Sequence, residues 1–441
     1  MTEPSARKLW PFRLPLPFRG EHRRGFAWSF VDQGLSSATN FGLSVLAGRL
    51  LGATGLGTVS VAFSVYLIAL VLQRSLLTGI LLAFTSALDS EQRARTAGMG
   101  LTLSLLAGVV TTTIALVLGS VVPGFGRTGL LLVAPWLVVL LLQDFWRSLL
   151  FRERRASAAC ANDGAWLVIM AAALPVAFVL KTQWAVMTVW GLGALAAAVL
   201  GFLQTRVSPS RIRSAWSWWH KEAWSFARWN ASAAMVVNLG GTAGRFVLAA
   251  IVGARALGGF RAVESLFAPL SVIAPALILP GLPAVARAYT VGFRRARDMA
   301  IAISGIAVAS ALLFFAFLFL GGWRLLPFLF GESFTQYRHL LLPMAVNQVF
   351  SAAGIGFGPL IMVQRRGGVL LLTRLIAVIT GIGITAVSAI LYGLTGATWA
   401  FAASSLISTL TLALGAIREP RRNGGVVPTI DAGLTTETII D

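Results

Sequence analysis

Two arginines lie well inside long apolar stretches of the sequence, where charged residues are rare. They are Arg74 and Arg245. An ionisable group at membrane depth costs about 2.5–3.5 kcal/mol on insertion scales, so it usually faces a cavity or a partner. Arginine stays protonated, and its planar fork matches the oxygens of a phosphate group. We therefore predict that both arginines bind an anion; for Arg74 the alternative is that it pairs with an acid such as Asp144 or extends to the membrane surface.

Polar residues in the first apolar stretch follow a helical repeat. Six of them lie between residues 28 and 48, four at four-residue steps and two beside them: Asp32, Ser36, Asn40 and Ser44, then Gln33 and Ser37. Four-residue spacing places side chains on one face of a helix. The stripe predicts one wall of a polar cavity. The alternative is that these residues hydrogen-bond to neighbouring helices, as Ser and Asn commonly do in membrane bundles.

A second polar stripe surrounds Arg245, because Asn238, Thr242 and Arg245 are spaced at i, i+4 and i+7. Further along, Asn347 and Gln348 form a patch that could hydrogen-bond sugar hydroxyls or pack between helices. The predicted substrate-binding residues are therefore Arg74, Arg245, Gln33, Ser36, Asn40, Asn238, Thr242, Asn347 and Gln348.

Few acidic residues accompany these arginines. Asp144 precedes Arg147 by three residues, which predicts a local ion pair, and Glu264 follows Arg261 at the same spacing and could pair with it. Asp32 and Asp144 are the candidates for binding a coupling ion, although Asp32 lies close enough to the end of its helix to be solvated.

The composition excludes a soluble enzyme. Of 441 residues, 57% are apolar and 12% are charged, whereas a soluble chain carries about 25% charged residues. Cys160 is the only cysteine, and the three histidines lie far apart outside the apolar stretches. We therefore expect no disulfide, no metal site, no catalytic residue and no enzymatic activity. The sequence has no phosphate-binding Walker motif, so we expect no cofactor and no direct use of ATP.

Twelve apolar segments are long enough to cross a bilayer. They lie near residues 28–48, 58–83, 97–119, 129–150, 163–180, 184–204, 230–252, 260–285, 299–320, 339–362, 369–391 and 397–417. The sequence thus predicts an all-α polytopic membrane protein with about 12 transmembrane helices. Two of the connections are tight hairpins, at Lys181 to Gln183 and at Gly393 to Gly396.

The positive charges report the orientation of these spans. Of the 36 Lys and Arg residues, 27 fall in the N-terminal segment or in the even-to-odd loops with their adjoining helix ends, and seven fall in the opposite loops. Lys and Arg accumulate on the cytoplasmic side, so both termini are predicted to be cytoplasmic. The net charge of +20 is explained as an orientation signal, and no nucleic-acid partner is expected.

These features divide the chain into five segments. We predict a basic cytoplasmic segment (1–27), a six-helix bundle (28–204), a cytoplasmic amphipathic linker helix (205–229), a second six-helix bundle (230–417) and a disordered cytoplasmic tail (418–441). In the linker, an apolar face follows a 4-3-4-3 spacing: Ile212, Trp216, Trp219, Ala223 and Phe226. Basic residues and tryptophans of this kind are typical of a helix on the anionic cytoplasmic leaflet.

The two bundles carry an internal repeat. The segment Leu51 to Gly57 (LGATGLG) aligns with Val252 to Gly258 (VGARALG) at an offset of 201 residues, and each follows the first helix of its block. At the same offset Arg245 aligns with Ser44. Because six spans separate the copies, they point the same way across the membrane, which indicates a parallel 6+6 repeat.

A family resemblance rests on these residues. A basic N-terminus, a first helix with Gln33, the turn from Leu51 to Gly57 and a second helix that ends at Gly79 resemble the polysaccharide-transport branch of the multidrug/oligosaccharidyl-lipid/polysaccharide (MOP) flippase superfamily. The resemblance covers all twelve spans in layout, and in residues mainly 26–85 and, more faintly, 229–285. It implies a V-shaped pair of six-helix bundles that works by alternating access.

The resemblance also implies a substrate and a location. The substrate would be an undecaprenyl-pyrophosphate-linked oligosaccharide, moved across a bacterial inner membrane for the assembly of O-antigen, capsule or exopolysaccharide. The implied partners are membrane lipids, a polysaccharide polymerase and the export machinery. The driving force stays open between the membrane potential, which favours outward movement of an anion, and a proton bound at Asp32.

Two other functions stay open. A drug/cation antiporter of the same superfamily would need a membrane-embedded carboxylate that faces the substrate, whereas the deepest charges in this sequence are arginines. An integral-membrane polysaccharide polymerase, ligase or acyltransferase would need a sizeable outer loop or a histidine in the membrane, and the sequence has neither.

Overall fold

A computed structural model describes residues 21–79, 81 and 89–418, and within these residues the chain is helical and has no strand. The first part contains α1 (Glu21–Gln73), the π-helical turn η1 (Arg74–Thr78), α3 (Ser90–Val121), α4 (Gly124–Val133), η2 (Ala134–Trp136), α5 (Leu137–Arg152), α6 (Ala156–Ala172), α7 (Leu174–Leu180) and α8 (Gln183–Thr205). The predictions for residues 1–20 and for the tail after residue 418 lie outside the described residues.

The second part follows a short connection. It contains α9 (Ile212–Trp218), η3 (Trp219–Ala223), α10 (Trp224–Leu266), η4 (Ala268–Val272), α11 (Ile273–Val291), α12 (Phe293–Leu320), η5 (Gly322–Arg324), α13 (Leu325–Phe330), η6 (Glu332–Leu340), α14 (Leu341–Ala353), α15 (Phe357–Val363) and α16 (Gly367–Ile417). We call α1–α8 the N-half and α10–α16 the C-half.

Nine apolar helical stretches in the described residues are long enough to cross a membrane. The stretch through α1 and η1 has 48 residues and that in α16 has 51, so each would extend about 70 Å or more at 1.5 Å per residue, over twice the hydrocarbon thickness. Non-helical glycines divide them, Gly52 in α1 and Gly393 in α16. Gly253 likewise divides α10, whose second part leads through η4 into α11. With these divisions, the described helices account for twelve spans, as the sequence predicts.

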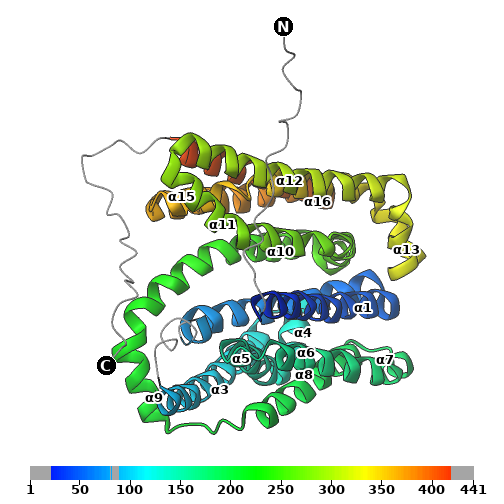
Figure 1. Cartoon of the computed structure of the whole chain (residues 1–441). Helices are drawn as coiled ribbons and strands as arrows, with labels where there is room; N and C mark the ends of the chain where they lie inside the picture. Colours follow the sequence, from blue (N-terminus) through cyan, green and yellow to red (C-terminus); the bar gives the residue numbers. More distant parts are fainter. Residues whose placement is uncertain (1–20, 80, 82–88, 419–441) are drawn as a thin grey trace.

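The two halves form separate groups of helices (Figure 1). The N-half, coloured blue to teal, lies on one side, and the C-half, coloured green to orange, lies on the other. The linker α9 and the first turns of α10 run along one end of the molecule and connect the groups. The opposite end carries α7 and α13, and we call it the α13 end.

At the α13 end the two copies of the repeat pack against each other. Gly52 and Gly253, 201 residues apart, have similar positive-φ conformations (φ 66 and 81) that favour glycine. A Cβ atom at Gly57 would lie 1.8 Å from the Ala254 carbonyl oxygen, and one at Gly258 would lie 1.8 Å from that of Ala53. The same offset relates both pairs, so the contact is reciprocal. The structure therefore supports the repeat that the sequence indicates, and only glycine allows this backbone approach.

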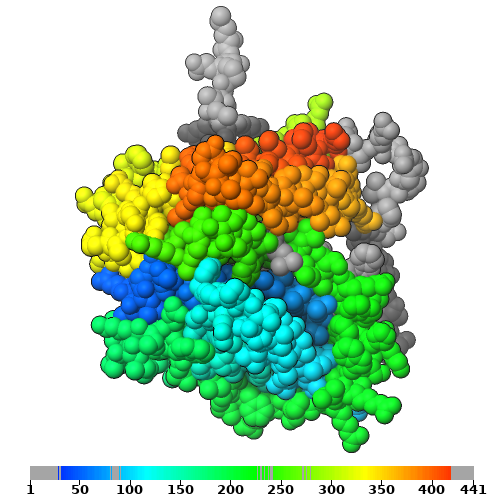
Figure 2. Space-filling view, turned by 180° about the vertical axis from the view of Figure 1, so that it is seen from behind, coloured from blue at the N-terminus to red at the C-terminus, as the bar shows by residue number. Residues whose placement is uncertain are grey.

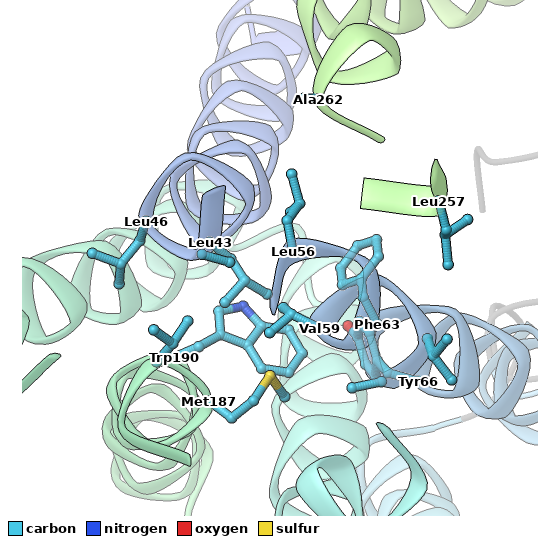
Figure 3. Packing of buried hydrophobic residues seen from close by; sticks show 14 of the residues in the cluster. Leu43, Leu46, Leu56, Val59, Phe63, Tyr66, Met187, Trp190, Leu257 and Ala262 are labelled. Atoms are coloured by element: carbon cyan, nitrogen blue, oxygen red, sulfur yellow. The ribbon is translucent and has the colours of Figure 1, made fainter. Parts of the chain in front are cut away.

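The hydrophobic core is shared at the α13 end and divided at the other. One cluster joins Leu56 and Phe63 of α1 to Leu257 and Phe260 of α10, and Figure 3 shows Trp190 of α8 packed close to Phe63 and Tyr66. Away from this end, each half has its own cluster, around Phe145 and Trp146 in the N-half and around Leu360 and Leu412 in the C-half. This division gives the molecule its V shape.

The linker forms the predicted helix, but only part of the predicted face is buried. Ala223 packs inward, whereas Ile212 and Trp216 are exposed. The indole Nε1 of Trp219 donates a hydrogen bond of 3.0 Å to the Leu76 carbonyl oxygen, which fixes the linker to η1 of the N-half. The exposed Ile212 and Trp216 are the residues available for the predicted contact with the membrane.

We predict that Gly258→Ala destabilises the protein by about 1–3 kcal/mol, because the added methyl group meets the backbone of the other half. Gly305→Ala is the matched control, since a Cβ atom at Gly305 meets nothing within 4 Å. Thermal unfolding of both variants in detergent measures the difference. Equal stability of the two variants would show that the glycine contact does not hold the halves together.

Candidate substrate cavity and buried charge network

A cavity of about 650 Å³ lies between the two halves. On one side its wall is the first part of α1, with Gln33, Ser37 and Asn40. At 1.5 Å per residue, Asn40 lies about 18 Å and Gln33 about 28 Å along the helix from the break at Gly52. The cavity therefore extends from the closed α13 end towards the end where the halves have separate cores.

The polar stripe of α1 is rotated relative to the prediction. Gln33, Ser37 and Asn40 line the cavity, whereas Asp32 is fully buried on another face and Ser44 is 4% exposed. The hydroxyl of Ser44 donates to the Asn40 carbonyl oxygen of its own helix, at 3.2 Å. The cavity-facing residues keep a helical i, i+4, i+7 spacing. The first part of α1 therefore presents a polar face to the cavity, and this face begins at Gln33 instead of Asp32.

Three charged residues of α10 form the opposite wall. One carboxylate oxygen of Glu264 accepts a hydrogen bond of 2.6 Å from Arg245, and the other accepts one of 2.8 Å from Arg261. The guanidinium of Arg261 also lies 5.0 Å from the centre of the Phe63 ring of the N-half. The predicted pair of Arg261 with Glu264 is confirmed. Two arginines share one glutamate, so this wall keeps a net positive charge.

A second cavity, of about 620 Å³, lies within the C-half between α10, α14 and α16. Asn347 and Gln348 line it, as does Arg374 of α16. Arg245 and Gln348 border both cavities, so the two spaces adjoin each other. Arg374 lies near the start of its predicted span, where a cation is expected to face the cytoplasm, and its place in a cavity depends on the packing of α16.

Four predicted substrate residues, Arg74, Ser36, Asn238 and Thr242, are not among those that line the two cavities. The Asn238 side-chain amide donates to the Ala234 carbonyl oxygen at 2.8 Å, and the Thr242 hydroxyl donates to the Asn238 carbonyl oxygen at 3.2 Å. Ser36 is half-buried beside the lining residues of α1. The hydrogen bonds of Asn238 and Thr242 stay within α10, where each side chain donates to a backbone carbonyl oxygen of its own helix.

The N-half contains a buried network of charges. Arg147 of α5 donates to Asp32 of α1 through Nε, at 2.9 Å, and through a terminal nitrogen. Its Nε also lies 3.3 Å from Asp163 of α6. The predicted pair of Arg147 with Asp144 is therefore wrong, because the partners of Arg147 lie on other helices. Asp32 is buried and paired, not solvated.

The same network includes the residues around Arg74. Arg74 donates to Asp144 at 2.5 Å, so this arginine has the acidic partner that the sequence offered as its alternative. The Gln143 amide nitrogen donates to Asp163 at 2.7 Å and to Asn162 at 3.1 Å. These bonds join η1, α5 and α6.

The network carries one uncompensated negative charge. Its ionisable groups are three carboxylates, Asp32, Asp144 and Asp163, and two guanidiniums, Arg74 and Arg147. One oxygen of Asp32 and one of Asp163 accept no hydrogen bond. Asp163 was missed at the sequence level because it stands at the predicted start of the fifth span, where an acid is ordinarily solvated.

An apolar groove of about 690 Å³ lies between the second part of α1, α3 and α10. Ile68 and Leu72 of α1, Ile114 and Leu118 of α3, and Phe246 of α10 are among its lining residues. Figure 2 shows α3, in cyan, beside α10, in green, on this face of the molecule. Phe246 directly follows Arg245, so α10 separates the polar cavities from the apolar groove.

Comparison with known proteins shows the fold. No family model matches the sequence, and no curated protein is similar to it. Among solved structures, a multidrug resistance MATE family transporter of the MOP superfamily in an inward-facing conformation has a TM-score of 0.70 at 14% identity, over 88% of this chain and 94% of that one. The lipid II flippase MurJ, inward closed, has a TM-score of 0.69 at 10% identity, over 89% and 87%.

A third solved structure has the same fold. It is a MOP superfamily transporter from Pyrococcus furiosus, described by a reverse polarity of its binding pocket that suggests a different function, with a TM-score of 0.61 at 14% identity over 90% of this chain and 95% of that one. An outward-facing MATE family transporter gives a TM-score of 0.60. The chain thus has the fold of these MOP superfamily transporters.

We predict that Arg147→Met lowers the free energy of unfolding by about 3–5 kcal/mol, because it leaves the buried carboxylates of Asp32 and Asp163 without their cation. Arg95→Met is the control, since Arg95 pairs with Glu91 on the surface, where both side chains are about three-quarters exposed, and such pairs contribute at most about 1 kcal/mol. Unfolding in detergent gives both values. A loss for Arg147→Met no larger than for Arg95→Met would contradict the structural role of the network.

Proposed function

We propose that this protein is a membrane transporter that flips an anionic, lipid-linked oligosaccharide by alternating access. The charge of the cavities carries the proposal. Their walls contain three arginines, Arg245, Arg261 and Arg374, and one glutamate, Glu264. In a low-dielectric site, a net positive charge favours an anion and opposes a cation. A pyrophosphate link between lipid and glycan is an anion of the required kind.

The distribution of polar and apolar surface supports an amphipathic substrate. Amide and hydroxyl groups such as those of Asn40, Asn347 and Gln348 face the polar cavities and suit sugar hydroxyls. On the other side of α10, the apolar groove beside Phe246 suits an isoprenoid chain. A single lipid-linked glycan supplies both surfaces, whereas a small drug needs only one.

Export of a drug or cation is the second candidate, and the carboxylates of the N-half favour it. Asp32 and Asp163 give the buried charge network of that half an excess negative charge. However, both are almost fully buried and line neither polar cavity. A cation that enters the cavities meets arginines first. Export of an anion therefore agrees better with the charges that a substrate would contact.

We assign the carboxylates to energy coupling instead. The single excess negative charge among Asp32, Asp144 and Asp163 favours the binding of one proton or one cation in the N-half. Outward movement of an anion also gains about 2.3 kcal/mol per charge for each 100 mV of inside-negative potential. Both sources suit a bacterial inner membrane with cytoplasmic termini, where a polymerase and the export machinery would receive the glycan. An enzyme of that pathway is a weaker alternative, since the similar structures are of transporters and a flippase.

We predict that variants of the charged cavity residues, expressed in a strain that lacks the gene, change transport in the direction expected for an anionic substrate. Arg245→Ala should leave lipid-linked glycan on the cytoplasmic side, Arg245→Lys should restore part of the transport, and Glu264→Gln should retain it, because it makes the wall more positive. The measurement is cytoplasmic glycan lipid per folded protein in the membrane. Normal surface polysaccharide in the deletion strain together with altered resistance to cationic drugs would refute the proposal.

A further inference from the structure

Arg374 is the cavity arginine that has no carboxylate partner among the residues that the structure describes. Arg245 and Arg261 share Glu264, whereas no ion pair or hydrogen bond joins Arg374 to a described residue. Its side chain is half-buried in the wall of the C-half cavity. A guanidinium in such a place carries a positive charge that none of the described residues neutralises by an ion pair, so its surroundings favour an anion.

The neighbouring amides are arranged to donate hydrogen bonds. The Ser351 hydroxyl donates to Ser405 at 3.0 Å, and the Ser405 hydroxyl donates to Oδ1 of Asn347 at 2.6 Å. This chain occupies the acceptor of Asn347 and leaves its amide nitrogen for the cavity. Gln348, which lines the same cavity, makes no side-chain hydrogen bond to another described residue. The cavity therefore presents a guanidinium fork and two amide donors.

A ligand can reach this set of donors from the cavity between the halves. Arg245, Glu264 and Gln348 border both spaces, and the acceptor groups of Glu264 already bind two arginines. An anion that enters between the halves therefore passes the partly neutralised Arg245 before it reaches Arg374. The sequence favoured Arg245 as the anion-binding residue, and the ion pairs shift that expectation to Arg374.

We propose that Arg374, with Asn347 and Gln348, forms a phosphate-binding site in the C-half cavity. The proposal rests on the proposed function, in which the pyrophosphate of a lipid-linked glycan is the anion. A guanidinium binds two phosphate oxygens at once, and the amides of Asn347 and Gln348 bind others. The same chemistry would recognise a free phosphate compound, so the test includes both sources.

The test measures binding to the purified full-length chain in detergent. The probes are inorganic pyrophosphate, farnesyl pyrophosphate and farnesol, and the readout is the change in tryptophan fluorescence or heat on titration. Both pyrophosphates should bind and farnesol should not. Arg374→Gln should weaken pyrophosphate binding by about tenfold or more, which corresponds to about 1.4 kcal/mol, and Arg374→Lys should weaken it less because it keeps the charge but loses the fork.

The matched control is Arg365→Gln, which removes the same charge from an exposed residue of the C-half that lines neither cavity. It should bind pyrophosphate as the unchanged protein does. Tighter binding of farnesyl pyrophosphate than of inorganic pyrophosphate would identify a lipid-linked ligand, and equal binding would identify a free phosphate compound; both support the site. Unchanged binding in Arg374→Gln, or equal losses in the Arg374 and Arg365 variants, would overturn it.

Binding and transport give independent answers. If the strain that lacks the gene exports its glycan normally while Arg374→Gln still loses pyrophosphate binding, the site stands and the proposed substrate is wrong. If transport fails in that strain but Arg374→Gln binds pyrophosphate normally, the substrate class stands and the phosphate lies elsewhere. Unfolding temperatures of the variants without ligand show whether a loss of binding comes from a loss of structure.

Discussion

The cost of placing a charge inside a membrane protein is the constraint on which this structure depends. Each charged side chain at membrane depth needs either an opposite charge or access to a polar space. The N-half meets this requirement with partners, since Arg147 joins Asp32 and Asp163, and Arg74 joins Asp144. The C-half meets it with cavities, because its arginines outnumber its one cavity glutamate. The two halves have related folds, but the N-half pairs its buried charges whereas the C-half places its arginines in cavities.

The glycine contact at the α13 end joins the two halves at one end of the molecule. Gly57 and Gly258 let the two copies of the repeat meet backbone to backbone, and the hydrophobic core is continuous at that end. At the other end each half has its own core. A molecule closed at one end and divided at the other holds a polar space between its halves. A reversal of that arrangement would expose the same space to the opposite side of the membrane, which is what alternating access requires.

Much of this architecture could be predicted from the sequence, because hydropathy and glycine act locally. The tight turns at Lys181 and Gly393 and the repeat around Gly52 and Gly253 follow from short patterns. The pair of Arg261 with Glu264 was also predictable, since its partners lie one helical turn apart.

The partners of Arg147 could not be predicted, because they come from helices that are distant in sequence. Two other residues were misplaced for a related reason. Asp163 and Arg374 lie near the predicted ends of spans, where a charge needs no explanation, and only the packing of α6 and α16 shows that they are enclosed. The face of α1 that lines the cavity shifted by one residue, from Asp32 to Gln33, because Arg147 draws Asp32 into the N-half. Local spacing thus finds a polar face, and tertiary charge pairing decides which of its residues line the cavity.

We propose that a positively charged cavity moves a pyrophosphate-linked glycan lipid. The most direct measurement is the rate at which such a lipid crosses the bilayer of vesicles that contain the purified protein, compared with the same glycan on an uncharged polyprenol and with a cationic drug. We expect rapid movement of the pyrophosphate lipid, faster when the potential favours an anion, and no acceleration of the other two. Equal movement of the uncharged lipid, or movement of the cation alone, would contradict it.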